Sequence, residues 1–361
     1  MKIAINTRLL IKDKLEGIGY FTFEVLSRIT KAHPEHEFYF FFDRKFSTEF
    51  IFSDNVKAIV LYPQARHPIL FNIWFDFSVT KALKKYKIDI FLSPDGMLSL
   101  KTKVPQIAVI HDLNFEYYPK DLPANITKYY KSRFPKFAKT ASSIITVSKH
   151  SKENIMSCYN ISENKINVVY NGSGKHYGSV ENKSVEKPYF IYVGSLHKRK
   201  NIKRMLHAFN NLKQEYKKPL DFIIVGDYLW NNEEKFDAIN NDIHFVGRKS
   251  GKELAKLVAC SKALIYVSYF EGFGIPILEG MKSGVPVVCS NTTSMPEVGG
   301  DAVIYVDPFS IESITKGMSE ALIEEKAEKY IKKGLVQSKK FSWDLSAQQV
   351  WEIILNTSKS M

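Results

Sequence analysis

Short apolar runs alternate along the chain with longer amphipathic stretches. The apolar runs have the length and composition of buried strands, and they lie at residues 2–7, 37–42, 58–62, 89–93, 106–111 and 143–148, and again at 189–194, 221–226, 243–247, 263–268, 285–290 and 302–307. Helices are expected between them, for example over residues 19–32, 75–86 and 250–261. Strands that alternate with helices predict parallel sheets covered on both faces. Because the series occurs twice, the sequence predicts an α/β protein with two doubly wound, Rossmann-like domains.

The break between the two series lies at residues 171–188, which are rich in Gly, Ser, Asn and Lys and have no periodicity. We therefore expect one domain over residues 1–175, a second over residues 176–340, and a terminal helix over residues 341–361. Ligands of open parallel sheets bind outside the carboxyl ends of the strands. We expect the two domains to face a central cleft that holds the functional site.

The composition changes this picture little. The chain has 361 residues, 45% hydrophobic and 25% charged, which is typical of a soluble globular protein with more than one core. Its apolar runs are too short to span a membrane, and its first residues are too polar for a secretory signal. The three cysteines, Cys158, Cys260 and Cys289, form no CxxC pattern. We therefore expect neither disulfides nor zinc, and a cytoplasmic location fits.

The net charge of +13 is concentrated in the first half, since residues 1–180 carry about +10. A positive charge attracts anionic partners, such as nucleic acid, an anionic membrane surface or phosphorylated small molecules, although scattered lysines also fit a biased composition. No module interleaves basic and aromatic residues, so nucleic acid is not an expected partner. The aromatic-rich residues 67–77 could lie peripherally on a membrane, but packing in the core is slightly favoured.

The first candidate site lies at residues 268–288, where Glu271 and Glu279 flank a Gly-Phe-Gly-Ile-Pro turn. Pro276 suits the first turn of a helix, whose free N–H groups bind phosphate or sugar hydroxyls. The turn residues expected near such a ligand are Gly272, Phe273, Gly274 and Ile275. The alternative is an ordinary helix start, with acidic residues favoured by the helix dipole.

The second candidate lies where a predicted strand ends at Gly194 and Ser195. The loop that follows places Arg199 and Lys200 together, and Asn201 is a plausible N-cap for the next helix. Clustered cations at a strand end match a diphosphate, although a solvated basic loop is the simpler interpretation.

Two weaker candidates lie in the first domain. Gly17 and Gly19 form a glycine-rich turn before a helix, and His111 follows a predicted buried strand. The chain lacks a complete G-x-G-x-x-G, a phosphate-binding P-loop, a G-x-S-x-G elbow and an H-E-x-x-H motif. It also lacks Asp-x-Asp, so we expect no carboxylate-held metal on a diphosphate. Dinucleotide, P-loop nucleotide, serine-hydrolase and zinc-protease functions are thereby disfavoured.

Together these motifs resemble the family 4 glycosyltransferases, which have the GT-B fold. Glu271 and Glu279 match the two glutamates of the family's Glu-x7-Glu signature. The resemblance covers nearly the whole chain and is carried by residues 17–25, 109–113, 192–201, 245–268, 271–291, 293–308 and 341–358. Departures from the family pattern are Gly280 in place of alanine and residues 268–270 in place of Pro-Ser.

The resemblance implies transfer of a hexose, with retention and without a metal or other cofactor, from GDP-mannose or a UDP-sugar. The implied acceptor is a saccharide or lipid-linked saccharide, in cell-surface polysaccharide or lipopolysaccharide synthesis. The first domain would bind the acceptor and the second the nucleotide sugar, and the terminal helix would cross back to the first domain. Two alternatives remain open, a nucleotide-sugar 2-epimerase of the same fold and a non-catalytic nucleotide-sugar-binding protein.

The resemblance also implies a role for each candidate residue. Glu271 would hold the hydroxyls of the transferred sugar, and Glu279 would hold the ribose. Arg199 and Lys200 would stabilise the departing diphosphate. Roles near the sugar and the phosphates fall to His111, Gly17, Gly19, Gly194 and Ser195.

Overall fold

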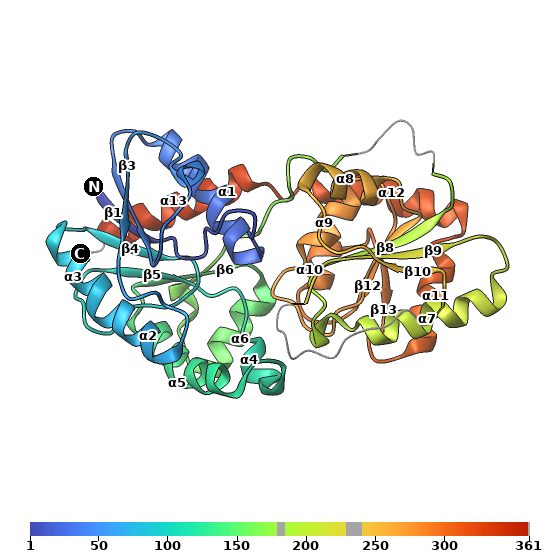
Figure 1. Cartoon of the computed structure of the whole chain (residues 1–361), viewed down its shortest axis with the longest axis horizontal. Helices are drawn as coiled ribbons and strands as arrows, with labels where there is room; N and C mark the ends of the chain where they lie inside the picture. The colour runs from blue at the N-terminus through green and yellow to red at the C-terminus, as the bar shows by residue number, and fades with distance from the viewer. Residues whose placement is uncertain (179–184, 229–239, 360–361) are drawn as a thin grey trace. The chain divides into compact units, whose positions relative to one another are not determined.

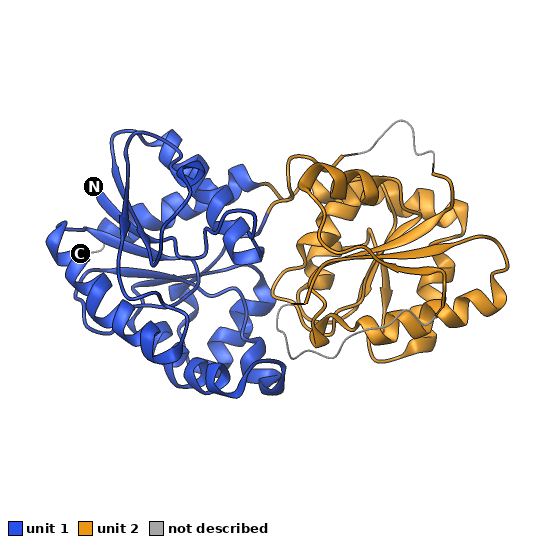
Figure 2. Ribbon diagram, viewed as in Figure 1, with its two compact units in different colours: residues 1–171, 343–361 blue, residues 172–342 orange. Residues whose placement is uncertain are grey.

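The computed structural model describes residues 1–178, 185–228 and 240–359. Its contacts divide the chain into two compact units (Figure 2). Unit 1 comprises Met1–Asn171 and Trp343–Met361, and unit 2 comprises Gly172–Ser342. The divisions differ by a few residues from those expected from the sequence, and the terminal helix belongs to the same unit as the first half of the chain.

Unit 1 is built on a seven-stranded sheet of order β3-β2-β1-β4-β5-β6-β7, with every neighbouring pair parallel. Its strands are β1 (Lys2–Asn6), β2 (Glu37–Phe42), β3 (Val56–Val60), β4 (Ile90–Ser93), β5 (Gln106–Val109), β6 (Ser143–Thr146) and β7 (Ile166–Val168). The first six match predicted strands. The edge strand β7 was not predicted, because three residues are too few to show a pattern.

Unit 2 is built on a six-stranded parallel sheet of order β10-β9-β8-β11-β12-β13. Its strands are β8 (Tyr189–Val193), β9 (Asp221–Val225), β10 (Ile243–Phe245), β11 (Ala263–Tyr266), β12 (Val287–Ser290) and β13 (Ile304–Val306). All six lie where the sequence predicted strands. The prediction of two doubly wound α/β domains is confirmed.

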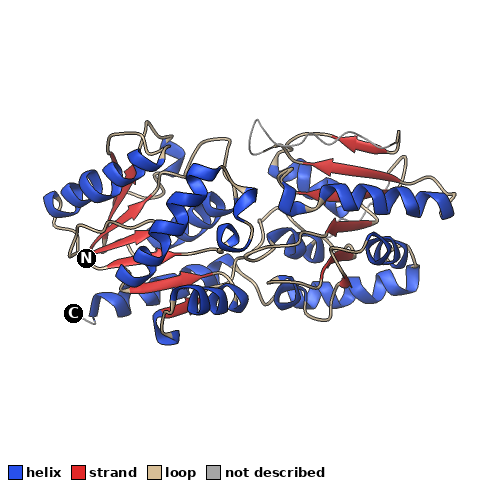
Figure 3. Cartoon of the chain, turned by 90° about the horizontal axis from the view of Figure 1, so that it is seen from below, coloured by secondary structure: helices blue, strands red, loops and turns tan. Residues whose placement is uncertain are grey.

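Helices lie on both sides of the strands in each unit (Figure 3). Those of unit 1 are α1 (Gly17–Ala32), α2 (Pro68–Ile73), the π-helix η2 (Trp74–Val79), α3 (Thr80–Lys85), α4 (Asn114–Tyr117), α5 (Ala124–Thr140), α6 (Lys149–Tyr159) and α13 (Trp343–Lys359). Those of unit 2 are α7 (Ile202–Glu215), α8 (Gly251–Ala259), α9 (Ile275–Lys282), α10 (Met295–Gly299), α11 (Ile311–Glu320) and α12 (Glu324–Ser338). Short 3₁₀ turns are η1 (Thr48–Phe50), η3 (Pro119–Asp121), η4 (Glu163–Lys165) and η5 (Lys198–Lys200).

The terminal helix α13 packs against α1 within unit 1. Trp351 of α13 is buried and stacks on the His33 ring at 3.9 Å between centroids. The Arg28 side chain on α1 donates to the Asp344 carboxylate at 2.5 Å. Large aromatic contacts of this kind contribute strongly to stability, so α13 is an integral part of unit 1.

The aromatic-rich residues 67–77 form a helix that begins at Pro68, earlier than expected. Proline is favoured at the first helical position, and the His67 ring accepts a hydrogen bond from the Ile69 N–H at 3.4 Å. Phe71 and Trp74 are buried, as core packing predicted, but other apolar side chains of the segment are exposed. No helix of the described residues is both long and apolar enough to cross a bilayer.

Candidate active site

A buried carboxylate held by two cations forms the centre of the candidate site in unit 2. Lys200 Nζ donates to Glu271 Oε1 at 2.6 Å, and Arg199 Nη1 lies 2.8 Å from Glu271 Oε2. The Glu271 and Lys200 side chains are only 7% and 8% exposed. Lys200 also donates to the Tyr266 hydroxyl at 2.7 Å. The cations follow β8 and the carboxylate follows β11, so this cluster joins the carboxyl ends of two neighbouring strands.

Burial by itself raises the pKa of Glu271, but the neighbouring charges of Arg199 and Lys200 outweigh this effect and lower the pKa to about 2. Glu271 is therefore ionised across the physiological range. The cluster of two cations and one carboxylate carries a net positive charge, which favours an anionic ligand.

Hydrogen bonds to backbone atoms fix the loop that carries Arg199 and Lys200. The His197 ring accepts from the Arg199 N–H at 3.3 Å, and the Tyr269 N–H donates to the Arg199 carbonyl at 3.0 Å. Asn201 precedes α7 as expected, but its side chain does not cap that helix. Asn201 adopts a left-handed backbone conformation. Its buried side-chain amide instead donates to the carbonyls of Val267 and Pro308 at 3.0 and 2.7 Å.

The turn after Glu271 leads directly into α9. Gly274 has a φ of 103°, a left-handed conformation that strongly favours glycine. The Ser294 hydroxyl lies 3.0 Å from the carbonyl oxygens of both Glu271 and Phe273, and so fixes the turn. Gly272 and Phe273 are buried, and Ile275 is the first residue of α9. The motif therefore presents a helix N-terminus beside the charged cluster.

Glu279 lies on α9 and has a different electrostatic environment from Glu271. Burial raises its pKa to about 7, and this is only partly offset by a hydrogen bond from Tyr177 and by the charge of Lys282. Near neutral pH the Glu279 carboxyl is therefore poised between its two protonation states. Tyr177 lies in the stretch predicted to be a linker, where no site residue was expected.

The remaining strand-end residues of unit 2 pack closely. A Cβ on Gly194 would lie 2.7 Å from the Tyr192 hydroxyl, which itself donates to the Ser195 carbonyl at 2.9 Å. A Cβ on Gly226, after β9, would lie 1.8 Å from the Gly194 carbonyl oxygen. Gly226 was not predicted as a site residue, although β8 and β9 both end in a Val-Gly pair.

His111 belongs to unit 1, where it follows β5. Its Nε2 lies 2.9 Å from the Pro94 carbonyl oxygen, which can only accept, so Nε2 carries the proton. Burial lowers the His111 pKa, outweighing the contact with the Pro94 carbonyl and the charges of Asp112 and Asp95, so the ring is neutral near pH 7. Its Nδ1 is then an acceptor suited to a hydroxyl group.

The two glycines of the first turn differ in their surroundings. Gly17 is the exposed first residue of α1, and no atom lies within 4 Å of the position that a Cβ would take. Gly19 is buried, and a Cβ there would lie 3.0 Å from the Leu9 carbonyl oxygen. Gly17 leaves space for a ligand, whereas Gly19 allows the preceding loop to pack on α1.

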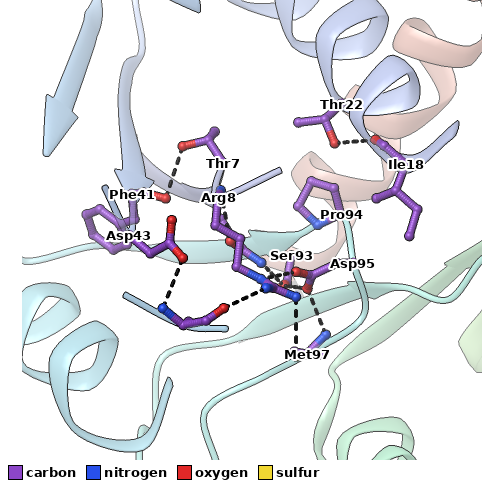
Figure 4. A network of polar contacts seen from close by, with 12 residues as sticks. Thr7, Arg8, Ile18, Thr22, Phe41, Asp43, Ser93, Pro94, Asp95 and Met97 are labelled. Atoms are coloured by element: carbon purple, nitrogen blue, oxygen red, sulfur yellow. Dashed lines mark hydrogen bonds and ion pairs between the residues drawn. The ribbon is translucent and has the colours of Figure 1, made fainter. Parts of the chain in front are cut away.

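A buried ion pair at the carboxyl ends of β1 and β4 was not predicted from the sequence (Figure 4). Arg8 Nε donates to Asp95 Oδ2 at 2.6 Å, and Arg8 Nη1 donates to the Ala65 carbonyl at 3.2 Å. Asp95 Oδ1 accepts from the Ser93 hydroxyl and from the Met97 N–H, both at 3.1 Å. The segment that this network holds contains Pro94, so it also fixes the carbonyl that orients His111.

The structure thus brings Glu271, Arg199 and Lys200 together, while His111, Gly17 and Gly19 belong to the other unit. Among the described residues, no group of three or more His, Cys, Asp and Glu side chains is arranged to hold a metal ion.

Comparisons with known proteins place this arrangement in a family. A family model described as glycosyl transferases group 1 matches residues 177–335, and one described as glycosyltransferase family 4 matches residues 16–173. Each model covers the greater part of one unit. The chain belongs to the group 1, family 4 glycosyltransferases. The resemblance of its motifs to that family is confirmed.

Three proteins illustrate the relationship. The glycosyltransferase is 28% identical to O-antigen chain mannosyltransferase B of Escherichia coli, across 95% of this chain and 97% of the relative. Its fold matches WaaG, a glycosyltransferase involved in lipopolysaccharide biosynthesis, with a TM-score of 0.77, 16% identity and coverage of 98% and 99%. It also matches Anabaena HepE in complex with UDP-glucose, with a TM-score of 0.74, 16% identity and coverage of 99% and 100%. The fold is therefore GT-B, and these matches do not favour an epimerase or a non-catalytic binding protein.

Acid should remove the stabilisation that the Glu271 carboxylate gives to this glycosyltransferase. Its pKa of about 2 lies below the ordinary 4.5, so its contribution is present above about pH 4.5 and is lost as the pH falls toward 2. At pH 7 we expect Glu271→Gln to cost about 3–5 kcal/mol, because two buried cations lose their counter-charge. Calorimetric melting should show that the gap between variant and wild type narrows at pH 3.5. The exposed Glu328→Gln is the control, and an equal gap at both pH values would contradict this account.

Proposed function

We propose that this glycosyltransferase transfers a hexose, mannose in the first instance, from a nucleotide diphosphate sugar with retention at the anomeric carbon. The acceptor is a saccharide or lipid-linked saccharide of a cell-surface polysaccharide or lipopolysaccharide. The observation that carries the proposal is the Arg199–Lys200–Glu271 cluster beside the N-terminus of α9. The activity of the related E. coli mannosyltransferase, as its name gives it, and the structural likeness to HepE in complex with UDP-glucose support the choice of sugar and of donor class.

Unit 2 binds the donor in this proposal. When the bond between the anomeric carbon and the phosphate oxygen breaks, negative charge grows on the diphosphate and positive charge on the sugar. Arg199, Lys200 and the positive end of the α9 dipole stabilise the diphosphate without reorganising, and they fill the role that a metal has in other transferases. The Glu271 carboxylate accepts from a hydroxyl of the transferred sugar in this proposal, and the ionised Glu279 accepts from the ribose diol.

Unit 1 binds the acceptor. The neutral His111 ring, with its proton on Nε2, offers Nδ1 to a hydroxyl of the transferred sugar. The acceptor oxygen forms the new bond to the anomeric carbon, and its proton passes to an oxygen of the departing phosphate. We place the protein in the cytoplasm, where nucleotide sugars are the donors for saccharides assembled on the inner face of the membrane.

Loss of the Lys200 charge should reduce transfer strongly. We expect Lys200→Ala to lower kcat/KM about a hundred- to thousandfold, the usual effect of removing one group that stabilises transition-state charge. Lys198→Ala is the matched control, since Lys198 is an exposed cation in the same loop. Transfer would be measured by release of the nucleoside diphosphate, with circular dichroism to confirm folding. A folded Lys200→Ala enzyme with wild-type turnover would refute the proposed role.

A panel of nucleotide sugars should identify the donor by thermal shift. A ligand that binds only the folded protein at 100 times its Kd stabilises it by about 2.7 kcal/mol. We expect GDP-mannose or a UDP-hexose to raise the melting temperature, and free mannose to have no effect. If every nucleotide sugar leaves the melting temperature unchanged, the proposed function is wrong.

Donor affinity should also depend on the ionisation of Glu279. Its pKa of about 7 means that ribose recognition by the carboxylate is present above pH 7 and is lost as the pH falls below it. We expect the Kd for the nucleoside diphosphate to rise about tenfold between pH 8 and pH 6. Calorimetry on Glu279→Gln should give weaker binding with a flatter pH profile, because titration of the phosphate is common to both proteins. The same slope in both would exclude Glu279 as its source.

A further inference from the structure

The helical run formed by α2, η2 and α3 presents apolar side chains to solvent. Ile69, Ile73 and Phe77 are 64%, 38% and 63% exposed. They are spaced four residues apart, so they lie along one face of the helix. The run follows the lower left edge of unit 1 in Figure 1. We call this row of three side chains the apolar stripe.

The opposite face of the same helix is anchored firmly in the core. Trp74 is fully buried, and its Nε1 donates to the Leu61 carbonyl at 2.9 Å. The Ser78 hydroxyl donates to the Tyr62 carbonyl at 2.5 Å. The stripe is therefore a fixed surface feature of a packed helix.

Cations surround the stripe, and almost no acidic residues accompany them. Residues 62–85 contain the exposed Arg66, Lys81, Lys84 and Lys85. Their one acidic residue is Asp76, which is buried, accepts from the Leu100 N–H at 2.8 Å and lies 3.6 Å from Arg133.

The neighbouring elements add further positive charge. Helix α5 contacts α2 and has no acidic residue in its sequence. Its exposed cations are Lys128, Lys131, Lys136 and Lys139, of which Lys131 lies 3.5 Å from Glu116. The loop that binds Asp76 through Leu100 also exposes Lys101 and Lys103.

We propose that the apolar stripe and the cations around it form a docking surface for an anionic lipid bilayer. An apolar helix face flanked by lysine and arginine is the pattern of helices that lie in the membrane interface, where the apolar side chains enter the acyl boundary and the cations meet headgroup phosphates. A protein partner fits less well, because lysine is depleted at protein–protein interfaces. The surface belongs to unit 1, the unit assigned above to the acceptor, yet membrane docking does not depend on the transfer reaction.

Vesicle flotation with the full chain tests the proposal. We expect the protein to float with phosphatidylcholine vesicles that contain phosphatidylglycerol, and to bind pure phosphatidylcholine weakly. Salt should weaken the binding, since it screens exposed charges. The triple variant Ile69→Gln, Ile73→Gln, Phe77→Gln should lose at least tenfold in bound fraction at limiting lipid. These side chains are exposed, so its melting temperature should stay close to that of the wild type.

Matched variants separate this surface from general stickiness. Ile323→Gln with Val336→Gln removes exposed apolar side chains from unit 2 and should leave flotation unchanged. Lys81→Gln with Lys84→Gln should weaken binding to anionic vesicles, whereas Lys217→Gln with Lys218→Gln, which removes the same charge from unit 2, should not.

Three outcomes would overturn the proposal: no flotation with anionic vesicles at low salt, a triple variant that floats like the wild type, or a stripe that controls oligomeric state in light scattering without affecting flotation. Flotation requires no turnover, so its result stands apart from the donor panel and from the assays of transfer.

Discussion

The structure of unit 2 depends on one buried carboxylate placed between two cations. A lone ionised glutamate in such a position would be very costly, and so would a lone lysine, but pairing the two offsets much of that desolvation cost. The ion pairs connect the loop after β8 to the loop after β11. The two cations are therefore held in place by the protein itself, and the stabilisation of a departing diphosphate that we propose requires such preorganisation.

Unit 1 contains the same device at the same place in its sheet. Strand β1 lies between β2 and β4, just as β8 lies between β9 and β11. In unit 1 a cation after β1, Arg8, pairs with a carboxylate after β4, Asp95; in unit 2, Lys200 after β8 pairs with Glu271 after β11. In both sheets this is the point where the strand order reverses, which is where open α/β sheets bind ligands. The two pairs fix the loop that carries the partner carbonyl of His111 in one unit and the loop that carries Arg199 and Lys200 in the other.

Much of this arrangement could be predicted from the sequence, because buried parallel strands and helix-start residues are local signals. The positions of the strands along the chain and the residues around the Gly-Phe-Gly-Ile-Pro turn follow from such patterns, whereas the order of the strands within each sheet was not predicted. The pairing of Lys200 with Glu271 joins residues far apart in the chain, and no local pattern shows it. Arg8 and Asp95 looked like two ordinary charges among many for the same reason. Asn201 was placed correctly, but its amide found buried carbonyls that only the folded chain brings near.

The path of the chain gives α13 a consequence for folding. Unit 2 is one continuous segment, whereas unit 1 is assembled from two segments that lie on either side of it. During translation Trp351 is synthesised only after the whole of unit 2. The surface around His33, at the end of α1, therefore lacks its aromatic partner while unit 2 is made. Unit 2 is thus free to fold as an autonomous insertion, and the first unit to be started is the last to be finished.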